Sequence, residues 1–235
     1  MEMRKTSGQQ GFTLVELLIS LVIFGAVLAG VVGMFTTTGH HHTAQEMMVD
    51  LTQDLRAVKQ LMVQELREAG CNPEKKGGIG FQMADTIQPA KVAHDTAGNS
   101  IHFTRDIDND IDAEGEPDGI LEPDGDADDP NEEIAYYRTR DNCTGTAGAL
   151  VPAGDNTRGC LRRDTGGGGM PMMPNVTEFE VTYFSEGAQI VPANNNLSRI
   201  DQVRVQIEAE VPIPEKVSPG ARTQGLDFRV WIRNT

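Results

Sequence analysis

Basic residues are scarce in this sequence of 235 residues, which has 20 Lys and Arg against 35 Asp and Glu and a formal net charge of −15. A chain of this charge lacks the general affinity for phosphate backbones that basic proteins show, so we expect its folded body to bind no nucleic acid. Cysteines are also few. Cys71, Cys143 and Cys160 form no C-x-x-C pair and have no His at zinc-ligand spacing, which argues against a structural zinc site.

Catalytic signatures are missing as well. The sequence contains no G-x-S-x-G, no H-E-x-x-H and no P-loop. His94 and His102 are isolated histidines, and the acidic residues have no companion nucleophile or base. We therefore expect that the chain is not an enzyme.

One apolar run near the amino terminus is long enough to cross a membrane. Phe12 to Phe35 spans 24 residues with Glu16 as its one ionisable side chain, and an α-helix needs about 20 residues for the ~30 Å hydrocarbon core. Arg4 and Lys5 precede it, so the positive-inside rule places residues 1–11 in the cytoplasm and the rest outside. The alternative is a secretory signal peptide, for which the following TTTGHHH offers only a poor cleavage site.

The residues around the start of this run carry a resemblance. The segment from Gly11 to Ile19, GFTLVELLI, resembles the processing signature of type IV pilins and type II secretion pseudopilins. In that family a membrane prepilin peptidase cuts after the glycine and methylates the new amino terminus. The resemblance implies that residues 1–11 are a cleaved leader, that the cut falls between Gly11 and Phe12, and that Phe12 becomes the methylated first residue.

Elementary electrostatics agrees with this resemblance. After cleavage, Phe12 would carry an α-ammonium at the edge of an apolar helix, and Glu16 of a neighbouring subunit could neutralise it at low dielectric. A lone carboxylate in a bilayer is costly, so Glu16 needs such a partner unless it reaches the interface. We expect that Phe12 and Glu16 set the axial register of assembly.

A second helical pattern follows over residues 36–70. Apolar residues recur at steps of three or four, which predicts that the helix continues to Ala69, with Gly70 as its stop and one face on a globular domain. The stripe comprises Met48, Leu51, Leu55, Val58, Met62, Leu66 and Ala69. The alternative, a soluble coiled coil, would leave the apolar first half exposed to water.

Beyond Cys71 the period changes to two, which is typical of strands with one buried face. The predicted strands are 176–183, 200–211 and 228–232, with shorter candidates at 100–104, 133–139 and 160–163. The predicted fold class is α+β: a long amino-terminal helix, membrane-spanning in its first half (12–35) and amphipathic in its second (36–70), packed on an antiparallel sheet in a head formed by 71–235.

The later segments carry a more diffuse resemblance, to the larger minor pilins of the PilW type and the related pseudopilins of the GspJ type. The segments that carry it are 134–138 (IAYYR), 160–163 (CLRR), 176–183, 201–205 (DQVRV) and 229–234 (RVWIRN).

The acidity of the chain is concentrated between two predicted strands. Residues 106–133 contain 14 Asp and Glu and no Lys or Arg, while the rest of the chain has 21 acidic and 20 basic residues. Acids at every second position can converge on Ca²⁺, which takes 6 to 8 oxygen ligands. The candidate ligands are Asp106, Asp108, Asp110, Asp112, Glu122, Asp124, Asp126, Asp128 and Glu133.

Two interpretations of this acidic loop stay open. Glu133 is the twelfth residue counted from Glu122, as in an EF-hand, but Ala127 stands at the sixth position and no helices flank the loop. The loop is therefore either a calcium-binding loop between strands or a solvated acidic loop that faces water or a basic partner.

The cysteines face an oxidising compartment if this topology holds. Cys143 and Cys160 could then close a loop of 18 residues, worth about 3 kcal/mol in the chain-entropy model. Cys71 would be the odd cysteine, although a bridge from Cys71 to either of the others stays open.

Three hypotheses for function remain. The leading one is a minor pilin that initiates or tips a type IV pilus, with prepilin peptidase, other pilins, the inner-membrane assembly platform and membrane lipid as partners. The runner-up is a minor pseudopilin of a type II secretion system. The third is a membrane-anchored calcium-dependent adhesin or enzyme that does not polymerise. We expect an inner-membrane location before assembly, and the cell surface or periplasm afterwards.

Overall fold

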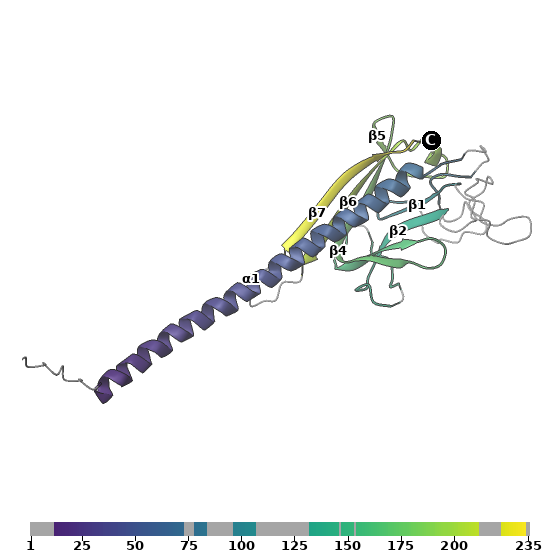
Figure 1. Cartoon of the computed structure of the whole chain (residues 1–235). Helices are drawn as coiled ribbons and strands as arrows, with labels where there is room; N and C mark the ends of the chain where they lie inside the picture. Colours follow the sequence, from purple (N-terminus) through teal and green to yellow (C-terminus); the bar gives the residue numbers. More distant parts are fainter. Residues whose placement is uncertain are drawn as a thin grey trace, which may run out of the picture.

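The computed structural model describes residues 12–72, 78–83, 96–106, 132–145, 147–152, 154–211 and 222–233. In these residues one long helix, α1 (Leu14–Glu68), leads into a head built from antiparallel strands (Figure 1). The lower part of α1 projects from the head, and its upper part lies across the sheet. This arrangement confirms the predicted α+β fold class.

Helix α1 runs without a break for 55 residues, which is about 82 Å at 1.5 Å per residue. Thr13 is its N-cap, so the helix begins two residues after Phe12. At the other end Ala69 leaves the helical conformation and Gly70 has φ 73°, which a glycine adopts at little cost. The predicted stop at Gly70 is therefore confirmed.

The sheet has seven strands, of which six follow the order β1-β2-β3-β4-β6-β7 and β5 pairs with β4. All neighbouring pairs are antiparallel. The strands are β1 (Ser100–Thr104), β2 (Glu133–Thr139), β3 (Gly159–Asp164), β4 (Met170–Ser185), β5 (Ala188–Ile190), β6 (Gln202–Val211) and β7 (Arg222–Trp231).

Each of the six predicted strands is present, and β1 and β2 have the predicted bounds. Sequence periodicity did not reveal β5 or the 3-10 helix η1 (Leu197–Arg199), because three residues are too few to show a period.

The core lies between α1 and the inner face of the sheet. The predicted apolar stripe supplies its helical side, where Leu55, Val58, Met62 and Leu66 are at most 3% exposed. Every strand except β5 contributes buried residues to the other side, together with Phe81, Leu197, Ile200 and Ile232 from outside the strands. Burying each such side chain contributes roughly 1.5–3 kcal/mol, so this half of α1 is tied firmly to the head.

The expectation that each strand turns one face to water is right for β6 and wrong for β2. Burial alternates along β6, whereas all seven residues of β2 are buried. The turn before β4 covers the outer face of β2: a Cβ atom on Gly169 would lie 2.0 Å from the Tyr137 hydroxyl oxygen. A glycine is therefore required at this close approach.

Candidate assembly site and its coupling to the head

The amino end of α1 holds the residues predicted to direct assembly. Thr13 and Glu16 form a capping box. The Glu16 backbone N–H donates to Thr13 Oγ1 (3.3 Å), while the Glu16 carboxylate accepts from the Thr13 N–H (3.1 Å) and hydroxyl (3.0 Å). Such a box satisfies two donors that a helix start otherwise leaves unpaired. Phe12 is 87% exposed beside it, and Gly11 lies outside the described residues.

The first half of α1 is not covered by any described part of its own head. Each large apolar side chain from Leu14 to Phe35 is exposed, by between 42% and 79%. The helix is long and apolar enough to cross a membrane by length and composition, and none of its most apolar stretch is buried. An apolar surface of this size is stable only in lipid or against other apolar helices.

Four glycines lie in this exposed half of α1 and at its junction with the head. A Cβ atom on Gly25, Gly30, Gly33 or Gly39 would meet no atom within 4 Å. Each glycine costs a helix about 1 kcal/mol relative to alanine, and nothing in the described part of the subunit requires its small size.

The second half of α1 is joined to the sheet by buried charge as well as by apolar contact. The Arg163 guanidinium on β3 donates to the Glu65 carboxylate (Nη2–Oε1 2.6 Å, Nε–Oε1 3.0 Å), and the Tyr136 hydroxyl on β2 donates to the same carboxylate. Burial by itself would lower the pKa of Arg163, but the hydrogen bond and the charge of Glu65 outweigh burial, so the pKa of Arg163 is raised. For the Tyr136 phenol, burial acts in the other direction and raises the pKa. Arg163 therefore keeps its charge, and the Tyr136 phenol stays neutral.

This connection was not predicted, since Glu65 and Arg163 are 98 residues apart in the chain. A signal was present in the sequence: at 100° per residue, Glu65 falls beside the apolar stripe that faces the sheet. A carboxylate at such a position needs a buried partner.

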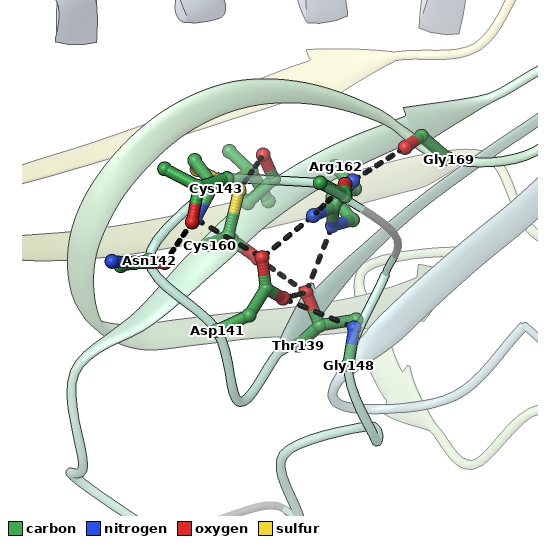
Figure 2. Close-up of a disulfide and its surroundings, with 11 residues drawn as sticks. Thr139, Asp141, Asn142, Cys143, Gly148, Cys160, Arg162 and Gly169 are labelled. Carbon is green, nitrogen blue, oxygen red and sulfur yellow. Dashed lines mark hydrogen bonds and ion pairs between the residues drawn. A yellow bond between two sulfur atoms is a disulfide. The ribbon is translucent and has the colours of Figure 1, made fainter.

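The disulfide lies at the far side of the sheet from α1, and it joins Cys143 to Cys160 at the start of β3 (Figure 2). Their Cα atoms are 5.1 Å apart. Cys143 has φ 65°, a left-handed conformation that side chains rarely adopt. Cys71, at the end of α1, is a free thiol whose pKa is raised by burial and by the charges of Asp106 and Glu68.

Next to the disulfide, a buried arginine is held by residues that lie before and after the loop that the disulfide closes. The Arg162 guanidinium donates to Asp141 (2.6 Å), to the Thr139 hydroxyl (3.1 Å) and to the Gly169 carbonyl (2.7 Å), as Figure 2 shows. Although burial opposes it, hydrogen bonds from Arg162, Thr139 and Gly148 lower the pKa of Asp141 to about 2. The carboxylate therefore stays charged opposite the guanidinium.

The two ends of the acidic loop are the only predicted calcium ligands within the described residues. Asp106 follows β1 and is buried, and its backbone N–H donates to the Cys71 carbonyl (2.8 Å). Glu133 begins β2, where its carboxylate lies 3.0 Å from His102 Nε2 inside the sheet. The other seven lie outside the described residues: Asp108, Asp110, Asp112, Glu122, Asp124, Asp126 and Asp128. In the described segments no group of three or more His, Cys, Asp or Glu could hold a metal ion.

One comparison with known proteins identifies the amino-terminal segment. Residues 6–32 match the family model described as the prokaryotic N-terminal methylation motif. Comparisons with curated proteins and with solved structures found no match. The motif implies processing by prepilin peptidase and assembly with other pilins, and it points to a structural subunit. The apolar helix is consistent with anchoring in the inner membrane. The motif and the α+β architecture together support a type IV pilin-like protein.

Proposed function

We propose that the chain is a minor pilin, a low-abundance subunit that initiates or tips a type IV pilus. The observation that carries this proposal is the contrast within α1: an apolar half without cover from its own head follows directly from a methylation motif. That half needs lipid before assembly and apolar helices afterwards, which are the two environments of a pilin-like subunit.

The capping box gives this proposal a local mechanism. The Glu16 carboxylate is oriented by two hydrogen bonds from Thr13, and it still has lone pairs for another donor. Cleavage between Gly11 and Phe12 would create an ammonium group on a neighbouring subunit, and pairing with an oriented carboxylate costs less entropy than pairing with a mobile one. Glu16 thereby sets the register between neighbouring helices.

The alternative, a minor pseudopilin of a type II secretion system, uses the same helix and the same motif. The resemblance of the head strands to PilW-type minor pilins favours the pilus. A deletion strain separates the two, with surface pili counted by electron microscopy and secreted proteins assayed in the same culture. We expect loss of pili with normal secretion. Normal pili with trapped exoproteins would indicate the pseudopilin, and no change in either would favour an anchored protein that does not polymerise.

Two variants of the capping box, one at Glu16 and one at Thr13, separate the charge of Glu16 from the capping of the helix. Glu16→Gln keeps a hydrogen-bond acceptor for Thr13 and removes the charge, whereas Thr13→Ala removes the cap and keeps the charge. We expect Glu16→Gln to abolish incorporation into filaments and Thr13→Ala to lower it only modestly, since a cap contributes about 0.5–2 kcal/mol. Glu46→Gln, on an exposed turn of the same helix, is the matched control. Normal incorporation of Glu16→Gln would contradict the mechanism.

A further inference from the structure

The two edges of the sheet differ in how they are covered. Along β1, the chain's own residues 80–82 close the edge: the Thr104 N–H donates to the Gly80 carbonyl (2.7 Å), the Gln82 N–H donates to the His102 carbonyl (2.9 Å), and Phe81 is 5% exposed in the core. Along β7, the described residues offer no such segment, and β7 ends the strand order. Ten residues of strand therefore form an open edge.

The register shows which backbone groups point outward from this edge. The Ile232 N–H donates to the Asp201 carbonyl (2.9 Å), so in the antiparallel ladder every second residue of β7 from Arg222 onward bonds to β6. The alternate residues turn their N–H and C=O groups away from β6. These are Thr223, Gly225, Asp227, Arg229 and Trp231, and each is exposed.

Basic side chains gather along the seam between this edge and α1. At 100° per residue, Arg56, Lys59 and Arg67 fall within about 80° of one another on one flank of α1. The Lys59 ammonium lies 5.7 Å from the centre of the Phe228 ring on β7, which places this flank beside β7. Arg222 begins β7, and Arg233, just beyond its end, lines a depression with Arg67.

The acidic side chains of the same stretch of α1 lie on the opposite flank. Asp50, Asp54, Glu65 and Glu68 fall within about 60° of one another, towards the β1–β3 side of the head. Glu68 also reaches the depression beside Arg67, but it is ion-paired with Arg105. Basic side chains thus cluster on one flank of α1, although the chain as a whole carries a net charge of −15. We call Arg56, Lys59, Arg67, Arg222 and Arg233 the basic seam.

Four of the five residues of the basic seam have no carboxylate partner in the described parts of the chain. Arg56, Lys59, Arg222 and Arg233 make no described ion pair with a carboxylate, and Asp227, on the outer face of β7, is held by Arg204 (Nε–Oδ1 2.9 Å). Membrane lipid does not explain the seam. Arg56 is 21 residues beyond Phe35, about 32 Å along the helix, whereas surface charge is screened within about 8–10 Å.

Half-exposed apolar side chains lie along the same seam. Met48 and Val63 on α1 and Leu226 on β7 are partly buried against the core and leave part of their surface open. An added strand would turn alternate side chains towards this apolar strip, as Phe81 does at the other edge.

We propose that the edge of β7 takes an extended acidic segment from the head of a neighbouring, different subunit, which adds a strand to the sheet and places carboxylates on the basic seam. The outward backbone groups supply affinity, and the seam selects an acidic sequence over a neutral one. The identity of the occupant as another subunit rests on the proposed filament function. The chemistry of the seam does not.

The test uses the purified full-length chain in detergent micelles and a defined peptide. The probe is a terminally blocked ten-residue peptide in which valine alternates with glutamate, and its control is the same peptide with glutamine. We expect the glutamate peptide to bind at least about tenfold more tightly, with affinity that falls as salt rises. Hydrogen exchange should then slow at Thr223, Gly225, Asp227, Arg229 and Trp231, and not at the intervening residues already bonded to β6.

Three variants separate the two parts of the site. Arg56→Glu with Arg222→Glu should weaken binding of the glutamate peptide at least tenfold and leave the glutamine peptide unchanged. Arg199→Glu, at an exposed arginine of η1 that is not one of the five residues of the basic seam, is the matched control and should lower affinity less than twofold. Thr223→Pro removes one outward N–H without touching the β6 ladder, so it should weaken both peptides equally.

Several results would overturn the proposal. These are equal binding of the two peptides, binding without alternate protection along β7, binding of a DNA duplex as tight as that of the glutamate peptide, and self-association through this edge. The result is separable from the proposed function. If the glutamate peptide binds but the deletion strain keeps its pili, the basic seam is supported and the proposed filament function is contradicted. Loss of pili without peptide binding would do the reverse.

Discussion

The two halves of α1 are one continuous helix with opposite surroundings. From Leu14 to Phe35 every large apolar side chain is exposed, whereas from Leu51 to Ala69 the apolar stripe is at most 8% exposed. The first half has no apolar partner among the described residues of its own subunit, and such a surface is stable only in a membrane or an assembly. The apolar stripe of the second half is buried against the sheet of the same subunit. Folding and assembly are therefore assigned to separate stretches of a single element.

The largest difference in stability between the two halves is expected at Glu65, the buried carboxylate of the second half. Glu65→Leu would leave Arg163 without its charge partner and Tyr136 without its acceptor, at a cost of about 3–5 kcal/mol in the free energy of unfolding. Urea unfolding of the head, followed by near-UV circular dichroism, measures this. Leu21→Ala in the first half should leave the unfolding midpoint unchanged, because that side chain is 66% exposed. A matching loss in both variants would show that the halves are not independent.

The disulfide should matter for the head alone. Cys143→Ser with Cys160→Ser should lower the free energy of unfolding by about 3 kcal/mol, because the open loop gains conformational freedom when unfolded. Thermal unfolding of the double variant beside Cys71→Ser checks this, and we expect the latter to stay near the native value. Membrane insertion, followed by fractionation, should be the same in all three proteins.

Acid should weaken the head through Asp141. Its pKa is lowered from 3.8 to about 2, so its stabilising effect is complete above about pH 4 and is lost as pH falls towards 2. Asp141→Asn should cost about 1.5–3 kcal/mol at neutral pH and flatten the pH dependence of unfolding in that window. An unchanged slope between pH 4 and 2 in the variant would show that other carboxylates govern it.

Calcium removal should act at the acidic loop and spare α1. If residues 106–133 bind Ca²⁺ with a Kd of about 10⁻⁴ M, the tight end of the range for extracellular modules, 1 mM Ca²⁺ should stabilise the head by about 1.4 kcal/mol. Limited proteolysis with and without chelator locates the effect through the cleavage sites. Cleavage within 106–133 at equal rates in both conditions would leave the loop as a solvated segment or a ligand for a basic partner.

The smallest expected effect is at the junction of the two halves. Gly39→Ala should stabilise the helix by about 1 kcal/mol, since a Cβ atom there meets nothing within 4 Å in the described part of the subunit. Far-UV circular dichroism of the full chain during heating in detergent measures it. Gly169→Ala is the contrasting glycine variant in the head, where the new Cβ would collide with Tyr137 and destabilise it.

Local sequence patterns were enough to predict most of the fold. They were not enough to predict which residues far apart in the sequence pair with one another. The stop of α1 at Gly70 and the bounds of β1 and β2 follow from periods and turn residues within a few positions. The capping box was equally available, because Thr13-x-x-Glu16 is a known signature of a helix start. The contacts of Glu65 with Arg163 and of Arg162 with Asp141 depend on strand order, which an alternating pattern does not determine.

The unbroken course of α1 joins its exposed apolar half to the head through one continuous helix. Each residue of an α-helix turns the chain by about 100° and advances it by 1.5 Å. One residue added between Phe35 and Ala44 would therefore swing the head to a different side of the anchored helix. Seven added residues would return it to within about 20° of its original bearing, raised by about 10 Å. The bearing of the head around the exposed half of α1 is thus set by the length of a stretch whose described side chains, up to residue 43, are exposed.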